Sequence, residues 1–173
     1  MKLFFTILIS VLFINSVDAQ KVFGTRNGKI AFEAPADDDV KAVNNEVTSR
    51  IADNGQLTFS LLIKGFKFSL AEMQDHFNDQ YLESSKFPRA DFKGNIVNLK
   101  EVNFAKDGTY KISVKGDLTM HGVTKNITVT GTLNIKGGKP AANAKFTVAM
   151  KDYNVKSTGV GEKVNIDISC QYQ

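Results

Sequence analysis

The sequence predicts an all-β domain of about eight antiparallel strands, closed into a barrel or packed as a sandwich, with one short amphipathic helix. Three observations carry this prediction: runs of alternating apolar and polar residues, turn-forming residues between those runs, and one segment whose apolar residues recur at helical spacing. Because closure removes exposed sheet edges, a barrel or a sandwich is the expected arrangement of so many strands.

The N-terminal segment predicts export. Lys2 supplies a positive start, residues 3–14 form an almost unbroken apolar run, and Val17-Asp18-Ala19 has the small-x-small pattern of a cleavage site. The run is shorter than the ~20 residues that a helix needs to span a bilayer. We therefore expect residues 1–19 to be a signal peptide cleaved after Ala19. Residues 20–173 are then expected to form one domain, periplasmic or secreted.

Eight runs with period two follow along the chain. This period places alternate side chains on opposite faces of a strand, so one face can be buried while the other stays wet. In residues 126–135, for example, Ile127 and Val129 alternate with threonine and asparagine. The predicted strands are KIAFEA from Lys29, residues 40–51, residues 57–68, residues 90–99, YKISVKG from Tyr110, residues 126–135, KFTVAM from Lys145 and VNIDISC from Val164.

One segment between the third and fourth runs changes to helical spacing. Ser69 and Glu72 are placed as a capping box, in which the serine caps the helix start and the glutamate reaches back. Leu70, Met73, Phe77 and Tyr81 then recur on one helical face. We predict a helix over about residues 70–83, ended by the approach of Pro88.

Charge and cysteine content restrict the partners. The net charge of +4 is spread along the chain, which favours neither nucleic acid nor stable membrane insertion and leaves a homodimer open. Cys170 is the single cysteine, so an exported chain of this kind has no internal disulfide and must rely on its core. Its place on the apolar phase of the last strand predicts a buried, inert thiol.

The residues show no pattern typical of catalysis. The two histidines, His76 and His121, lie far apart without metal-ligand spacing, and no GxSxG nucleophile motif occurs. His76 lies off the apolar stripe and is expected to be partly exposed. Asp37-Asp38-Asp39 lacks the alternating ligands of a calcium loop, so a solvated loop is expected there. We predict no enzyme activity, no metal site and no cofactor.

Phenylalanine dominates the aromatic residues, with thirteen phenylalanines and no tryptophan. Several of them flank the predicted helix and the strand before it: Phe59, Phe66, Phe68, Phe77, Phe87 and Phe92. Patterning alone favours an aromatic core. The same side chains could also form the wall and mouth of an apolar ligand cavity, since such cavities are concave and mostly apolar.

Two motifs resemble those of the YceI-like family. Residues 117–135 read DLTMHGVTKNITVTGTLNI, and together with Gly116 they match the family segment G-x-L-T-x-H-G-V-T-K. Residues 81–92 read YLESSKFPRADF and are similar to the family stretch LDSxKYPxAxF. The resemblance extends over essentially the whole chain after the N-terminal segment.

The resemblance implies a lipocalin-like antiparallel barrel, exported, with an elongated apolar cavity. It also implies a ligand such as a polyisoprenoid, an isoprenoid quinone or a fatty-acid-like lipid, and no catalytic residue. His121 to Lys125 would then be the turn of a family hairpin, and their polar side chains would fix that turn by hydrogen bonds to neighbouring backbone.

The first hypothesis is thus a carrier or reservoir for a long apolar molecule. The predicted cavity wall is Phe59, Leu61, Ile63, Phe66, Phe68, Ile112, Val114, Ile127, Val129, Leu133, Phe146, Val148 and Ile166, with Met73 and Phe77 of the helix closing one end. The alternative is a barrel filled by its own side chains, with a structural or stress-related role and no ligand.

Overall fold

The computed structural model describes residues 20–35, 37–156 and 161–173. The predicted signal peptide and residues 157–160, which connect the last two predicted strands, therefore lie outside the described residues. Eight strands follow one another along the chain. Their bounds are β1 Val22–Ala34, β2 Asp37–Ala52, β3 Gln56–Leu62, β4 Arg89–Ile96, β5 Gly108–Met120, β6 Val123–Lys136, β7 Lys139–Ala149 and β8 Lys163–Gln171.

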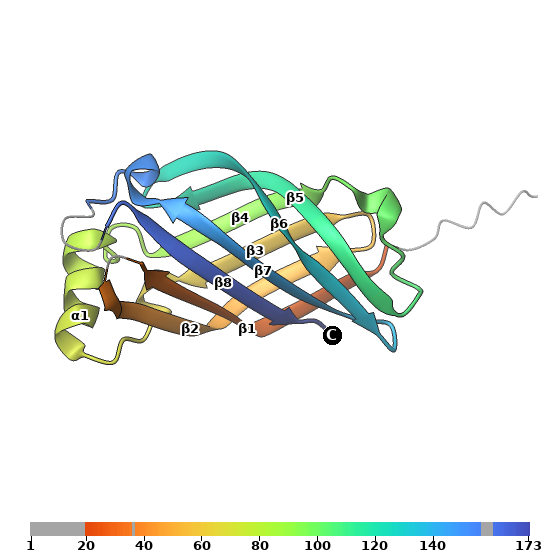
Figure 1. Ribbon diagram of the computed structural model, residues 1–173, viewed down its shortest axis with the longest axis horizontal. Coiled ribbons are helices and arrows are strands. Elements are labelled where there is room, and N and C mark those ends of the chain that lie inside the picture. Colours follow the sequence, from red (N-terminus) through yellow and green to blue (C-terminus); the bar gives the residue numbers. More distant parts are fainter. Residues whose placement is uncertain (1–19, 36, 157–160) are drawn as a thin grey trace, which may run out of the picture.

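The strands form one closed antiparallel barrel in sequence order, with β1 paired to both β2 and β8. The oblique strands wrap around a common interior, and α1 covers one end (Figure 1). The predicted eight-stranded antiparallel barrel with one short helix is thereby confirmed, and the sandwich alternative is excluded. Among the described residues, none of the helices is both long enough and apolar enough to cross a membrane.

The short helical elements lie between strands. They are the 3₁₀ turns η1 Ile63–Gly65, η3 Leu99–Glu101 and η4 Met150–Tyr153, the α-helix α1 Ala71–His76, and the one-turn π-helix η2 Phe77–Tyr81, hereafter the π-turn. The predicted helix is therefore present, but its second half is a widened π-turn. The predicted capping box is wrong, because the N-cap is Leu70 and no side chain caps it. Instead the Gln74 amide donates to the Phe66 carbonyl at 2.7 Å and ties the helix to the chain before it.

Two other local predictions need correction. The third strand was expected to run from residue 57 to 68, but it ends at Leu62, where η1 turns the chain; one bridge, between Val43 and Lys67, continues the pairing. Residues 37–39 were expected in a loop, whereas they begin β2. Both errors arise because alternation and acidic composition report burial and solvation rather than where a strand ends.

The interior contains two packed apolar clusters. One lies toward α1 and includes Val47, Leu61, Ile63 and Leu82. The other includes Ile51, Leu133, Ile135, Cys170 and Tyr172. Phe59 and Ile168 pack against both clusters while staying partly accessible. Accessible apolar side chains between two solid clusters indicate that the barrel is hollow in its middle.

Candidate functional site

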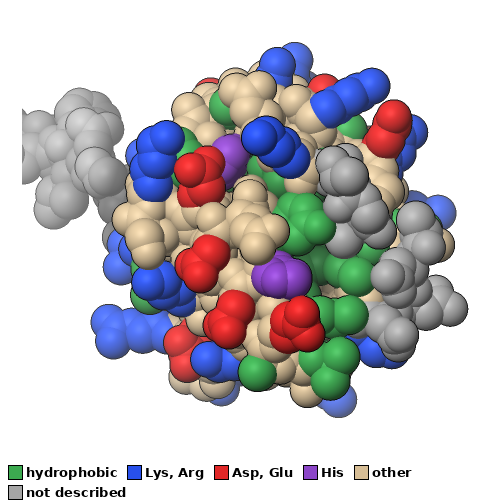
Figure 2. All heavy atoms as spheres, turned by 90° about the vertical axis from the view of Figure 1, so that its left-hand side faces the viewer, with side chains coloured by type: hydrophobic (Ala, Val, Ile, Leu, Met, Phe, Trp, Pro, Cys, Tyr) green, Lys and Arg blue, Asp and Glu red, His purple; other side chains and the backbone are tan. Residues whose placement is uncertain are grey.

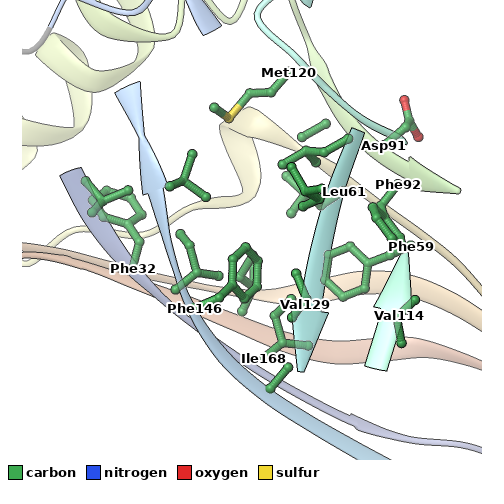
Figure 3. Close-up of a pocket in the computed structure, with 18 of the residues that line it drawn as sticks. Phe32, Phe59, Leu61, Asp91, Phe92, Val114, Met120, Val129, Phe146 and Ile168 are labelled. Atoms are coloured by element: carbon green, nitrogen blue, oxygen red, sulfur yellow. The ribbon is translucent and has the colours of Figure 1, made fainter. Parts of the chain in front are cut away.

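An apolar cavity of about 190 Å³ occupies the hollow between the two clusters. Inward side chains from all the strands except β2 line it, because each strand turns every second residue to the interior. Figure 3 shows the rings of Phe32, Phe59 and Phe146 around it, with Val129 and Ile168 between them. The cavity can therefore hold an apolar molecule by desolvation, and it offers few polar groups for chemistry.

Asp91 is the charged residue at the edge of this lining. In Figure 3 its carboxylate points away from the surrounding apolar side chains. Asp91 accepts a hydrogen bond from Ser60 and forms an ion pair with Arg89 at 3.4 Å, and both Asp91 and Arg89 are well exposed. Its charge is thus satisfied outside the barrel and leaves the interior apolar.

Most of the residues predicted for the wall come together on this lining. They are Phe59, Leu61, Ile63, Phe66, Phe77, Ile112, Val114, Ile127, Val129, Phe146, Val148 and Ile166. Their contact with a ligand stays a prediction, since this placement concerns the cavity alone.

Three predicted wall residues lie elsewhere. Leu133, on the same inward phase of β6 as Val129, is fully buried in the cluster away from α1, so it fills the interior beyond the cavity. Phe68 and Met73 line a second hollow, of about 220 Å³, beneath α1. Met73 therefore does not face the barrel interior, although it shares the apolar helix face with Phe77.

Sequence reasoning missed part of the lining. Phe32 and Ile168 share the inward phase of predicted strands, so strict counting of alternate positions could have found them. The pattern did not indicate Gly131, Ala142 and Ala144, because glycine and alanine have low strand propensity and do not stand out as inward-facing apolar residues. A Cβ on Gly131 would lie 3.1 Å from the Cβ of Ala144, so these small residues let β6 and β7 approach closely and leave space inside.

A buried polar group closes the cavity at the end away from α1. The Ser49 hydroxyl donates to the Thr58 carbonyl at 2.8 Å and so accepts from the Tyr172 hydroxyl at 2.9 Å. Burial raises the pKa of Tyr172, and neighbouring Cys170 adds to the effect. Burial likewise raises the pKa of Cys170 to about 11, and the thiol is 1% exposed. The predicted burial of Cys170 is confirmed, and its raised pKa disfavours the reactive thiolate.

The two sequence motifs meet in space at the other end. His121 and Gly122 form the two-residue turn between β5 and β6, both with positive φ, as such hairpins require. The His121 ring reaches away from its own turn: Nδ1 lies 3.0 Å from the Tyr153 carbonyl and Nε2 lies 2.9 Å from a Glu83 carboxylate oxygen. The Phe87 ring packs edge-on against it at 4.5 Å.

This contact set, the His121 junction, corrects the expected role of the turn. The side chain fixes distant elements rather than neighbouring backbone, since it joins the β5–β6 turn to η4 and to the chain after η2. A carbonyl only accepts, so Nδ1 must donate; a proton on Nε2, or one on Glu83, then completes the second contact. Glu83, His121 and Asn154, the described non-glycine residues with positive φ, all lie at or next to this junction.

No group of three or more His, Cys, Asp or Glu side chains that could hold a metal ion occurs in the described part of the chain. His76 is exposed on α1, as predicted. The site that remains is the apolar cavity, with the polar junction holding the elements at one of its ends.

The amino-acid sequence is similar to those of several known proteins. The chain is 34% identical over 109 residues to a UPF0312 protein of Pseudomonas fluorescens, a match that covers 58% of this chain and 53% of that protein. It is 32% identical over 109 residues to a UPF0312 protein of Pseudomonas putida, with the same coverage. The matched region spans about half the length of these curated relatives.

Solved structures share the fold at low sequence identity. A polyisoprenoid binding domain from Saccharophagus degradans superposes with a TM-score of 0.68 at 11% identity, covering 88% of this chain and 93% of that one. BcnA of Burkholderia cenocepacia superposes with a TM-score of 0.64 at 15% identity, covering 84% and 96%. The model of the YceI-like domain matches residues 14–172, so the chain belongs to the YceI-like family.

Proposed function

We propose that this protein is an exported binding protein that holds a long apolar chain, such as a polyisoprenoid, an isoprenoid quinone or a fatty-acid-like lipid, inside its barrel. It acts as a carrier or reservoir and performs no covalent chemistry on the chain. The observation that carries the proposal is the apolar cavity of about 190 Å³ between two solid core clusters.

An empty cavity of this size is costly. At ~24 cal/mol per Å³, the cost seen for core cavities, 190 Å³ corresponds to roughly 4–5 kcal/mol. That is comparable to the whole stability of a marginal domain, about 5–15 kcal/mol. A chain that maintains such a space gains most when a ligand fills it.

The binding energy would come from desolvation. Each methylene transferred from water to the cavity contributes about 0.8 kcal/mol, so an apolar chain gains affinity in proportion to the length it buries. Few polar contacts are needed, in agreement with a lining drawn almost entirely from apolar side chains. The resemblance in fold to a structure described as a polyisoprenoid binding domain supports this ligand class.

Native mass spectrometry of protein purified from its own host without detergent tests the proposal, followed by solvent extraction of any bound molecule. A stoichiometric apolar ligand is the expected result. A bare polypeptide that also takes up no added isoprenoid or fatty acid would favour the alternative, a barrel with a structural role and no ligand.

Export is the second part of the proposal. It rests on the N-terminal charge, apolar run and cleavage pattern of residues 1–19. We expect the extracytoplasmic fraction to contain a chain that begins at Gln20, as determined by intact mass. Leu12→Arg, which interrupts the apolar run, should leave the full-length chain in the cytoplasm. An uncleaved chain outside the cytoplasm would contradict the predicted cleavage.

A further inference from the structure

Two hollows adjoin on the α1 side of the barrel interior, since their linings share residues. The inner chamber is the cavity of about 190 Å³ described above. The outer chamber is the hollow of about 220 Å³ beneath α1, bordered by Phe68, Met73, His76 and Lys156. Figure 2 looks onto this end of the molecule, where apolar side chains gather in a depression beside a histidine.

Four phenylalanine rings stand between the chambers, and we call Phe32, Phe66, Phe68 and Phe77 the aromatic septum. Phe32 and Phe77 stack with centroids 5.4 Å apart, at an interplanar angle of 19°. Phe66 and Phe68 meet the Phe77 ring at 5.5 and 5.0 Å. Each ring therefore contacts Phe77.

The order of the rings shows that the septum crosses the path from one chamber to the other. Phe66 lines the inner chamber and is absent from the outer lining, whereas Phe68 has the reverse placement. Phe32 and Phe77 line both chambers, and so do Leu82, Met150 and Val164. Removing the Phe77 ring, which the other three rings of the septum contact, is expected to widen the passage between the chambers.

The two central rings differ in how firmly the backbone holds them. Phe32 is paired in the barrel on both sides, to Ala42 of β2 and to Ile166 of β8. Phe77 begins the π-turn that follows a helix of six residues. Helices of a few residues are marginally stable on their own, and single π-helical turns are frequent at functional sites, so we expect Phe77 to be displaced more readily than Phe32.

The volumes of the two chambers show why the septum matters for ligand length. Pockets that enclose small-molecule ligands usually measure about 300–1,000 Å³, and each chamber alone falls below that range. The two volumes added together enter it. The septum therefore limits the length of chain that the inner chamber alone can hold, and a longer chain must pass the septum.

We infer that Phe77 is the residue that determines how long an apolar chain the barrel accepts. With the ring in place, a chain ends at the septum; a longer chain is accommodated at the cost of displacing Phe77 from its three ring contacts. This inference rests on the proposed function, because it assigns chain-length selectivity to the proposed cavity.

A ladder of prenyl alcohols of increasing length tests the inference: geraniol, farnesol, geranylgeraniol and solanesol. Dissociation constants are measured for the delipidated full-length mature protein and for Phe77→Leu, Phe77→Ala and Phe77→Trp. In the unmodified protein, affinity should rise along the ladder and then level off. The alcohol at which it levels off is called the break. In Phe77→Ala it should continue to rise for at least one further alcohol, by about tenfold or more, because additional methylenes become buried. Phe77→Leu should shift the break less, and Phe77→Trp should move it to a shorter alcohol.

Two control variants separate the septum from general effects. Phe104→Ala removes a ring of the stacked Phe23–Phe104 pair, which borders neither chamber, and should leave the profile unchanged. Phe59→Ala enlarges the inner chamber and leaves the septum intact. If Phe59→Ala shifts the break as far as Phe77→Ala, volume alone sets the length and the inference is wrong.

The outcomes also separate the inference from the proposed function. Binding by the unmodified protein with the same break in every Phe77 variant overturns the inference and leaves the carrier function standing. If no prenyl alcohol binds to any variant, while natively purified protein also carries no ligand, the proposed function fails and the inference fails with it.

Discussion

At the scale of single residues, the interior is divided between side chains that create space and side chains that close it. Gly131, Ala142 and Ala144 leave room where β6 and β7 approach. Tyr172 and Ser49 close the end away from α1 with a satisfied hydrogen bond. A polar group is tolerated inside because it is paired, and an unpaired charge on the wall would cost several kcal/mol.

Substitution of Val129 tests the wall directly. Val129→Asp places a carboxylate among apolar side chains of the cavity, so uptake of farnesol should be lost and the free energy of unfolding should fall by about 2–4 kcal/mol. Thr128→Asp is the matched control, because Thr128 is the neighbouring exposed residue on β6. Equal uptake by folded Val129→Asp protein would remove this residue from the binding wall.

The buried thiol of Cys170 predicts that the free energy of unfolding falls at alkaline pH. Unfolded Cys170 ionises with an ordinary pKa of 9.0, whereas burial raises the folded pKa to about 11. Between these values the unfolded chain releases a proton that the folded chain retains, so ionisation favours unfolding and stability falls as pH rises from about 9 to about 11. The loss is at most about 3 kcal/mol, at ~1.4 kcal/mol per pKa unit.

Urea unfolding across this pH range measures the effect. Cys170→Ala should lose less stability than the unmodified protein between the two pKa values, and the slope that remains includes Tyr172, whose pKa burial also raises. Parallel curves for the two proteins would mean that the thiol does not ionise on unfolding in this range.

At the scale of secondary structure, the barrel end near α1 is assembled by contacts between elements rather than within them. The His121 junction joins the β5–β6 turn, η4 and the chain after η2 through one imidazole ring that is 8% exposed. Gly122 is required beside it, because a Cβ there would lie 2.7 Å from the Phe87 ring and the backbone has φ +74°. These contacts hold Glu83 and Phe87, in the chain that follows η2, against the β5–β6 turn.

Replacing each histidine in turn compares the contribution to stability of His121, in the junction, with that of His76, on the surface. His121→Ala should lower the free energy of unfolding by about 2–3 kcal/mol, since it breaks two partly buried hydrogen bonds and an aromatic contact. His76→Ala, on the exposed face of α1, should change it by less than about 0.5 kcal/mol. Chemical denaturation followed by circular dichroism measures both values. A loss as small for His121→Ala as for His76→Ala would show that the junction contributes nothing to stability.

The elements also show which predictions the sequence supports. The alternation of apolar and polar residues predicted the existence of all eight strands. It missed the first half of β1, because irregular pairing between Thr25 and Ile30 breaks the alternation. It ran past the end of β3 because Ile63 and Phe66 stay buried after the chain has turned. The meeting of the two motifs at His121 has no local signal, since its partners lie 32 and 38 positions away.

At the scale of the whole molecule, the proposed function links stability and ligand binding through the same cavity. Two solid clusters hold the ends of the barrel, and the space between them is the part of the interior that the chain does not fill. Closure of the sheet leaves no edge strand through which the barrel could relax to fill that space. The free protein therefore carries a free-energy cost that a bound chain would remove.

Thermal unfolding of delipidated protein measures this linkage. A ligand that binds the folded state alone stabilises it by RT ln(1 + [L]/Kd), or about 2.7 kcal/mol at a hundredfold excess over Kd. For a domain of this size we expect Tm to rise by roughly 5–10 °C with farnesol or geranylgeraniol, and to follow the logarithm of ligand concentration. Val129→Asp, with its wall disrupted, should keep a constant Tm over the same titration, and Thr128→Asp should follow the unmodified protein. A Tm that stays constant in the unmodified protein, and equal to that of protein purified with its native contents, would indicate that the barrel is stable as it stands and would favour the structural role without a ligand.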